Sequence, residues 1–121
     1  MITKDEGNIF VFTSTERAFI SEDKGKTWTE YSNGIQKVNY RYKSVIKESP
    51  TGEIFLAYNE NLYKFNNSNN TWDKKYKAID YIEDFSFSPD GANIYLAENN
   101  QFLISKNSGP FNKVTNWSTH S

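Results

Sequence analysis

The chain has 121 residues, with 14 lysine and arginine residues against 15 aspartate and glutamate residues, which leaves a net charge of -1. This balance argues against nucleic acid and anionic lipid as partners, because both are held by an excess of basic side chains. The absence of cysteine excludes disulfides and thiolate metal sites. No apolar run reaches the roughly 18 residues of a membrane span, and the first residues have no apolar signal core.

The predicted strands recur in units of about 40 residues, and an aromatic content of 17% favours strands over helices. Each unit begins with a glycine that leads into an apolar run. A short polar turn and a second apolar run follow, and a tight loop then ends in an aromatic residue that starts a third strand. In chain order the first runs are 7–12, 52–57 and 91–97, the second runs are 18–21, 62–65 and 102–105, and the aromatic residues are Trp28, Trp72 and Phe111.

A further strand precedes the second and third units, at 42–48 and 82–87. Each of these strands is followed by a Ser-Pro-x-Gly segment, at 49–52 and 88–91. Proline at the second position and glycine at the fourth favour a type I turn. The second and third units therefore contain four predicted strands, whereas the first contains three.

A four-stranded antiparallel unit of this length is typical of a β-propeller blade. The runs 9–12 and 54–57 are apolar throughout, as expected where a sheet is covered on both faces. The charged segment 71–77 fits an exposed edge strand. We therefore predict an all-β fold of about three blades in a single segment 1–121, with repeats near 1–38, 39–79 and 80–121, the first lacking its inner strand.

The loop 21–28 matches the pattern S-x-D-x-G-x-T-W at every fixed position. In such a loop aspartate caps backbone amides, glycine supplies a positive φ angle and tryptophan buries its ring against the blade. The motif resembles the Asp box of sialidase-like, or BNR-repeat, propellers, and degenerate copies follow at 65–72 and 105–111. On this resemblance the structural Asp-box residues are Ser21, Asp23, Gly25, Thr27, Trp28, Asn67, Thr71, Trp72, Asn107, Gly109 and Phe111.

The resemblance implies a fold and leaves the activity open. Sialidases of this kind are expected to hold the substrate carboxylate with three arginines beside a catalytic tyrosine, but this chain has only Arg17 and Arg41. The carboxylates at 80–84 are explained by a loop that enters a strand. The one histidine, His120, gives neither a triad nor a metal site. We therefore predict no enzyme, no metal and no cofactor.

The leading hypothesis is a noncatalytic scaffold or binding module that presents loops to a protein or glycan. One alternative is a fragment of a sialidase-like glycoside hydrolase with its catalytic residues elsewhere, and another is a purely architectural self-assembling unit. The resemblance favours an extracellular or cell-surface bacterial protein. Candidate ligand-binding residues lie in the turns and linkers opposite the Asp boxes, where propellers usually bind: Glu16, Arg17, Tyr40, Arg41, Asn59, Glu60, Asn61, Asp80, Tyr81, Asn99, Asn100 and Gln101.

Three blades fall short of the four to eight that close a propeller. Two explanations stay open. A homodimer would complete a six-bladed ring, with the tail 114–121 of one copy supplying the inner strand that the first unit of its partner lacks. Alternatively, the remaining blades belong to a longer parent chain.

Overall fold

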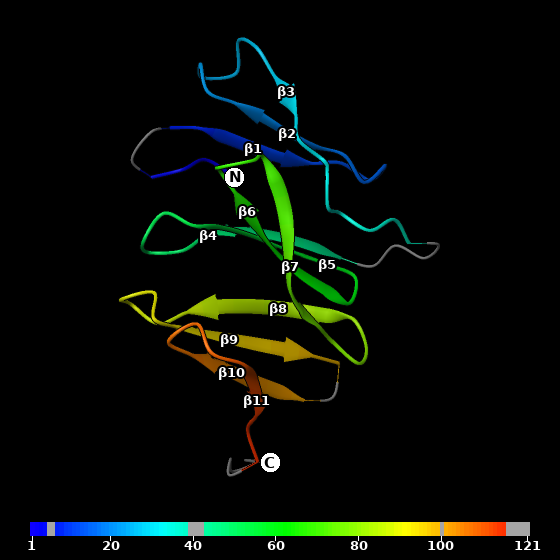
Figure 1. The fold of residues 1–121 in the computed structure, drawn as a ribbon, viewed down its shortest axis with the longest axis vertical. Helices are drawn as coiled ribbons and strands as arrows, with labels where there is room; N and C mark the ends of the chain where they lie inside the picture. Colours follow the sequence, from blue (N-terminus) through cyan, green and yellow to red (C-terminus); the bar gives the residue numbers. More distant parts are fainter. Residues whose placement is uncertain (5–6, 39–42, 100, 116–121) are drawn as a thin grey trace.

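Three antiparallel sheets follow one another along the chain and stack in sequence order (Figure 1). The computed structural model describes residues 1–4, 7–38, 43–99 and 101–115. Sheet 1 contains β1 (Ile9–Phe12), β2 (Ala18–Ser21) and β3 (Thr29–Glu30). Sheet 2 contains β4 (Ser44–Glu48), β5 (Ile54–Tyr58), β6 (Asn61–Asn66) and β7 (Thr71–Lys77). Sheet 3 contains β8 (Ile82–Phe87), β9 (Asn93–Glu98), β10 (Phe102–Lys106) and β11 (Phe111–Lys113).

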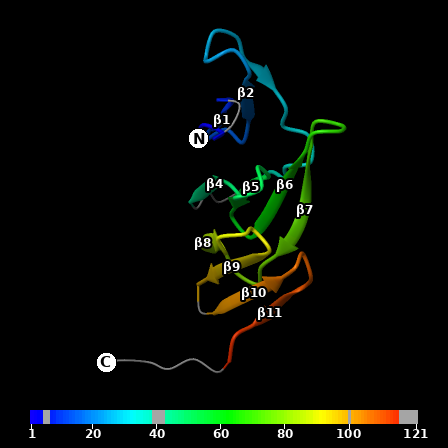
Figure 2. The ribbon, with the colours of Figure 1, turned by 90° about the vertical axis from the view of Figure 1, so that its left-hand side faces the viewer.

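Strands pair in sequence order within each sheet, so every connection between two strands of the same sheet is a hairpin. The innermost strands β4 and β8 lie along one side of the stack, and the outermost strands β7 and β11 lie along the other (Figure 2). The prediction of an all-β fold built from antiparallel sheets of three or four strands is confirmed, including the three-stranded first sheet. Closure into a propeller stays a prediction.

The two Ser-Pro-x-Gly segments form the turns that their residue order predicts. The Gly52 amide donates to the Ser49 carbonyl over 3.0 Å, and the Gly91 amide donates to the Ser88 carbonyl over 2.9 Å. Both bonds join the first and fourth residues, as in a hydrogen-bonded β-turn, and the type I geometry stays a prediction. These turns reverse the chain between β4 and β5 and between β8 and β9.

The first three residues lie along the free edge of sheet 1. Ile2 forms an isolated antiparallel bridge with Ile9. The Met1 and Phe10 backbones exchange two hydrogen bonds, of 2.9 Å from the terminal amino group of Met1 and 2.7 Å in the other direction. The place of an inner strand, for which the sequence of the first unit offers no candidate, is thus partly taken by residues 1–3. The tail 114–121 is the other candidate for this place, and its residues 116–121, which include Trp117 and His120, lie outside the described residues.

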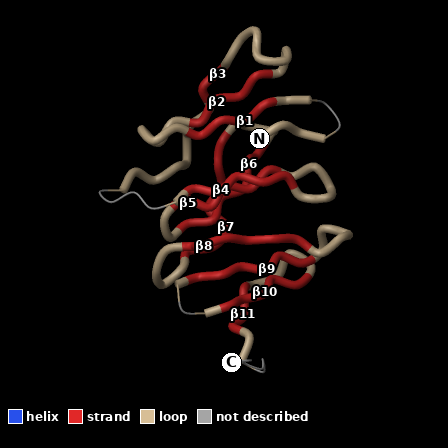
Figure 3. The backbone as a smooth tube through the Cα atoms, turned by 180° about the vertical axis from the view of Figure 1, so that it is seen from behind, coloured by secondary structure: helices blue, strands red, loops and turns tan. Residues whose placement is uncertain are grey.

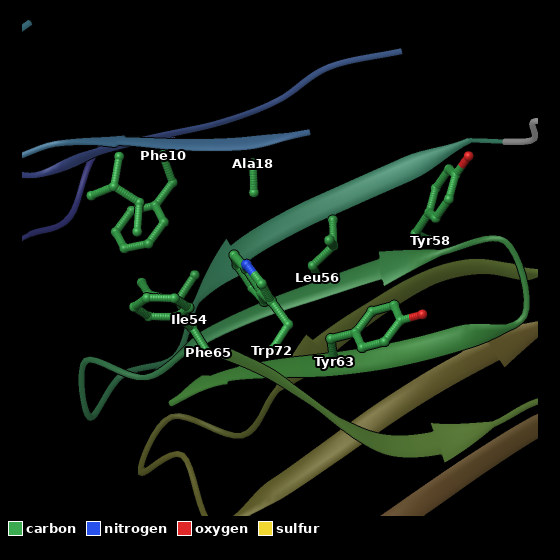
Figure 4. Close-up of a cluster of buried hydrophobic side chains, with 9 residues drawn as sticks. Phe10, Ala18, Ile54, Leu56, Tyr58, Tyr63, Phe65 and Trp72 are labelled. Atoms are coloured by element: carbon green, nitrogen blue, oxygen red, sulfur yellow. The ribbon is translucent and has the colours of Figure 1, made fainter. Parts of the chain in front are cut away.

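We call the two faces of each sheet forward and backward. The forward face looks in the direction of the later sheets of the chain, and the backward face looks in the opposite direction. The forward face of sheet 1, with Phe10 and Ala18, packs on the backward face of sheet 2, with Leu56, Tyr63 and Trp72 (Figure 4). The forward face of sheet 2, with Phe55, Ala57 and Leu62, packs on the backward face of sheet 3, with Leu96 and Leu103. Sheet 2 is therefore covered on both faces, and all five residues of β5 are buried.

The linker from sheet 1 to sheet 2 is fixed by Trp72 at the start of β7. The Trp72 indole Nε1 donates to the Tyr31 carbonyl over 2.8 Å, and its amide donates to the Asn33 carbonyl over 2.8 Å. A Cβ atom on Gly34 would lie 2.1 Å from the Trp72 carbonyl oxygen, so only glycine fits there. Trp72 thus holds the linker against the edge of sheet 2.

Candidate functional site

The connecting segments lie at the two ends of the strands. The glycine end, as we call it, carries the loops at 21–28, 49–53, 66–70, 88–92 and 107–110. The opposite short-turn end carries the turn 13–17 and the turns that join β5 to β6 and β9 to β10. The sequence placed the candidate ligand site at the short-turn end. Tyr40, Arg41 and Asn100 of that set lie outside the described residues.

Glu16 at the short-turn end is buried between sheets 1 and 2. Its Oε2 atom accepts the Tyr58 hydroxyl over 2.9 Å and the Val38 amide over 2.8 Å. One carboxylate therefore joins the turn of sheet 1, a strand of sheet 2 and the linker between the two sheets. This candidate ligand residue has a structural role, because its oxygen faces the protein interior.

Glu98 repeats this arrangement between sheets 2 and 3. Its Oε2 atom accepts the Tyr76 hydroxyl over 3.0 Å and the Gln101 side-chain amide over 2.6 Å, while its Oε1 atom accepts the Ile79 amide over 2.8 Å. Burial and the hydrogen bond to this carboxylate raise the pKa of Tyr76 to about 12. Gln101 therefore helps to hold an internal carboxylate, and Glu98, absent from the predicted set, is the centre of the junction.

The turn between β5 and β6 is also directed inward. Asn61 is fully buried, and its amide Nδ2 donates to the Tyr63 hydroxyl over 3.2 Å. The same hydroxyl accepts the Gln36 amide over 2.9 Å. Burial is the largest cause of the raised pKa of Tyr63. Asn59 is partly buried beside Asn61, whereas Glu60 stands 4.0 Å from Lys77 at the surface.

Arg17 lies on the surface at the same end. Its guanidinium contacts a Glu30 oxygen at 2.7 Å and lies over the Phe19 ring at 5.0 Å from the ring centre. The hydrogen bond from Arg17 is the largest cause of the lowered pKa of Glu30. Arg17 is thus engaged within sheet 1, and no second arginine occurs among the described residues.

Three predicted residues do meet at the surface of the short-turn end. The Asn99 side-chain amide donates to Asp80 Oδ2 over 3.1 Å, and the Tyr81 hydroxyl donates to Asn99 Oδ1 over 3.2 Å. Asp80 also accepts the Tyr81 amide over 2.9 Å. Asp80, Tyr81 and Asn99 form a polar cluster whose side chains bond mainly to one another. Asp84, further along, is paired with Lys47 at 3.0 Å.

The loop 21–28 forms the closed network that its motif predicts. Asp23 Oδ1 accepts the Thr27 amide over 2.8 Å and the Ser21 hydroxyl over 2.9 Å, while Asp23 Oδ2 accepts the Thr27 hydroxyl. The Ser21 hydroxyl oxygen accepts the Gly25 amide over 2.8 Å. The bonds from Thr27 lower the pKa of Asp23 to about 2. Asp23 therefore serves its own loop.

The two degenerate loops reach similar turns through other atoms. In the second loop Asn66 Oδ1 accepts the Ser68 amide over 2.9 Å, and Asn69 Oδ1 accepts the Thr71 hydroxyl over 2.6 Å. In the third loop the Ser105 hydroxyl donates to the Gly109 carbonyl over 2.6 Å. Asn67 lines a cleft, Asn107 bonds through its amide to the Ala92 carbonyl, and Phe111 packs on Tyr76 with ring centres 4.7 Å apart.

A cleft of about 480 Å³ opens between sheets 1 and 2 at the glycine end. Its apolar wall comes from Phe10 and Ile20 of sheet 1 and from Ile54 and Phe65 of sheet 2. Its polar lining includes Thr3, Asn8, Glu22, Tyr31, Glu48, Thr51, Asn67 and Asn70. Carboxylates, carboxamides and hydroxyls therefore surround a small apolar floor, and no basic side chain is among the lining residues.

Two hydrogen bonds position this cleft. Thr3 Oγ1 accepts the Asn8 amide over 2.8 Å, which ties residues 1–4 to the start of β1. Glu48 Oε1 at the end of β4 accepts the Lys4 amide over 2.7 Å, which ties sheet 2 to the same residues. The sequence did not point to this cleft because its lining comes from two different repeats. The recurrence of polar loops at the glycine end was the only available signal.

A smaller cavity of about 160 Å³ lies between sheets 2 and 3 at the same end. Its lining includes Lys64, Lys75, Phe87 and Phe111. Lys64 pairs with Glu53 beside it. The equivalent junction thus carries basic side chains and less space, so the cleft between sheets 1 and 2 is the better candidate site.

Within the described ranges, no group of three histidine, cysteine or acidic side chains is placed to hold a metal ion. The described part of the chain also contains no helix long and apolar enough to cross a membrane; it consists of strands and loops (Figure 3). Comparison with protein-family models and with curated proteins gives no match to this sequence.

Proposed function

We propose that this chain is a noncatalytic, propeller-type binding module of the Asp-box kind, and that the cleft between sheets 1 and 2 holds a neutral saccharide. The observation that supports this proposal is the cleft itself. Its volume of about 480 Å³ lies within the usual range for small-molecule sites. Hydrogen-bonding groups around a limited apolar floor suit a ligand with many hydroxyls and one apolar face.

The charge of the lining favours a neutral ligand over an acidic one. Glu22 and Glu48 both line the cleft, and among the described residues no lysine, arginine or histidine does. Like charges across a binding surface disfavour association. A sialylated or phosphorylated sugar would bring its anion toward these carboxylates, whereas a neutral sugar can donate its hydroxyls to them.

A noncatalytic role is supported by the partners of the perturbed side chains. Active sites collect groups with shifted pKa values. Here Asp23, with its pKa lowered to about 2, bonds to Thr27 of its own loop, and Tyr76, with its pKa raised to about 12, bonds to Glu98 inside a junction. Both shifts come from contacts that stabilise the fold.

The test is binding of neutral disaccharides, namely lactose, maltose, cellobiose and diacetylchitobiose, by isothermal titration calorimetry, with sialyllactose as the acidic comparison. We expect at least one neutral sugar to bind and sialyllactose to bind more weakly than lactose. Asn67→Trp fills the cleft with an indole and should abolish binding. Asn99→Trp places the same ring at the short-turn end and should leave binding unchanged.

Failure of all four sugars to bind would overturn the saccharide proposal. Loss of binding in Asn99→Trp but not in Asn67→Trp would move the site to the short-turn end. Release of monosaccharide from any sugar during the titration would contradict the noncatalytic role.

A further inference from the structure

The outer faces of the first and last sheets are built like the faces that are buried inside the molecule. The backward face of sheet 1 carries Ile9, Val11 and Phe19, because these residues alternate with the core residues of β1 and β2. The forward face of sheet 3 carries Tyr95, Ala97, Phe102 and Ile104, which form the cross-strand pairs Phe102 with Ala97 and Ile104 with Tyr95. Polar residues share these faces, with Glu30 and Arg17 beside Phe19 on sheet 1, Ser86 beside Tyr95 and Asn112 beside Ile104 on sheet 3. No described residue covers either face with another sheet.

Equivalent positions in the repeat are exposed on these two faces and buried where a neighbouring sheet covers them. Val11 is 41% exposed, whereas Leu56 at the same position of sheet 2 is 0% exposed. Trp28 is 45% exposed, whereas Trp72 is 2% exposed. On the forward face of sheet 3, Phe102 is 38% exposed, whereas its equivalent Leu62 is 0% exposed.

The Asp-box interpretation predicted that each aromatic ring of the loop would be buried against its own blade. The two tryptophans instead show that burial comes from the preceding sheet. Trp72 lies in the cluster that joins sheets 1 and 2. Trp28 packs beside Gly25 and Ile9 on the uncovered backward face of sheet 1.

From these equivalences we propose that two copies of this chain associate head to tail, with the forward face of sheet 3 in one copy packed on the backward face of sheet 1 in the other. The chain itself indicates that a second copy covers these faces, because each of its two internal junctions already joins a forward face to a backward face. The surfaces left open at the two ends are the matching halves of a third such junction. This inference does not depend on the saccharide proposal.

One polar contact fixes the register of the new junction. Inside the chain Trp72 Nε1 donates to the Tyr31 carbonyl. Tyr31 and Val114 are equivalent, because the Tyr31 amide bonds to the Ala18 carbonyl and the Val114 amide bonds to the Phe102 carbonyl at matching positions of β2 and β10. In the assembly the Trp28 indole therefore donates to the carbonyl of Val114 in the second copy.

A head-to-tail contact differs from a symmetric face-to-face contact, since each junction uses two different surfaces. Two copies that form two such junctions close into a ring of six sheets. Three exposed large apolar side chains, Val11, Trp28 and Phe102, would leave water there, together with the half-buried Ile104. Removal of such patches from solvent is the driving force expected for association.

The test is the mass of the 121-residue chain by size-exclusion chromatography with light scattering, together with two single variants. Val11→Lys places a charge on the backward face of sheet 1, and Phe102→Lys places a charge on the forward face of sheet 3. Both side chains are exposed in one chain, so each variant should fold, which far-ultraviolet circular dichroism checks. We expect the unaltered chain at twice 14.1 kDa and each variant at 14.1 kDa.

A mixture of the two variants gives the decisive result. Val11→Lys keeps an intact forward face and Phe102→Lys keeps an intact backward face, so head-to-tail pairing predicts a 1:1 complex in the mixture alone. Trp28→Phe, which keeps the ring and loses the N–H donor, should weaken association about tenfold. A monomeric unaltered chain at millimolar concentration, a variant that still dimerises by itself, or a mixture that stays monomeric would overturn the proposal.

Discussion

The Tyr58 hydroxyl donates a hydrogen bond to Glu16 over 2.9 Å, although the two residues are 42 positions apart and belong to different sheets. Both side chains are buried, so water cannot replace this hydrogen bond once the sheets have packed. Glu98 and Tyr76 repeat the pairing at the next junction. The stack is thus held by apolar faces and by one internal carboxylate at each junction.

Tyr58→Phe removes one donor and leaves the Glu16 carboxylate short of a hydrogen bond. We expect a loss of about 1–3 kcal/mol in the free energy of unfolding, because a buried acceptor loses its partner. The measurement is urea denaturation followed by tryptophan fluorescence. Tyr81→Phe, in the surface cluster with Asn99, is the control and should change stability by less than about 0.5 kcal/mol. Equal effects of the two substitutions would contradict the structural role of Glu16.

Gly34→Ala places a Cβ atom 2.1 Å from the Trp72 carbonyl oxygen and keeps a φ angle of +99°. The linker has to move away from β7, so we expect the free energy of unfolding to fall by more than about 2 kcal/mol. Gly7→Ala is the matched control: its φ angle is +69°, but no atom lies within 4 Å of the new Cβ. Strain alone should then cost about 1 kcal/mol. Thermal unfolding of both variants would show whether contact with Trp72, rather than the φ angle, sets the difference.

Asp23 makes the stability of the loop 21–28 depend on pH in the acid range. Its pKa falls from 3.8 to about 2 on folding, mainly through the Thr27 hydrogen bonds. A carboxyl with a depressed pKa stabilises the folded state above pH 4 and loses this contribution as the pH falls toward 2. Thr27→Val should raise the pKa of Asp23, as measured by carboxyl-carbon NMR titration. An unchanged pKa in this variant would contradict the network as the cause.

Tyr76 makes a second contribution, at alkaline pH. Its pKa rises from 10.0 to about 12, first through burial and then through Glu98. A raised phenol pKa stabilises the folded state fully below pH 10, and this contribution is lost between pH 10 and pH 12. Glu98→Gln removes the negative charge and should lower the pKa of Tyr76 while burial keeps it above 10. Ring-carbon NMR of labelled tyrosine would report both values, and a pKa that stays at about 12 would contradict the part assigned to Glu98.

Much of the fold follows from local patterns in the sequence. The apolar runs, the Ser-Pro-x-Gly turns and the loop 21–28 specify strands and reversals over a few residues each, and the structure contains them at the expected positions. The repeat also gives the number of strands per sheet. Asp23 and Thr27 interact within four residues, so their network could be predicted from the motif alone.

The candidate site depends on pairs of residues that the local pattern cannot bring together. In the sequence, Glu16 and Gln101 resemble exposed polar residues of short turns. In the structure, Glu16 accepts a hydrogen bond from Tyr58 and Gln101 donates one to Glu98, and both contacts direct the side chains inward. The cleft joins Asn8 and Glu22 to Thr51 and Asn67, which come from different sheets. Its position follows from how two repeats pack, and single-repeat comparison carries no such information.

The most direct test of the proposed site is the map of backbone amide shifts in nitrogen-15 NMR spectra as the tightest-binding neutral disaccharide is added. We expect the amide signals of Glu22, Thr51, Asn67 and Asn70 at the glycine end to shift together, while those of Glu60, Tyr81 and Asn99 stay unchanged. Shifts confined to the short-turn end, or no shifts at saturating sugar, would contradict a binding cleft between sheets 1 and 2.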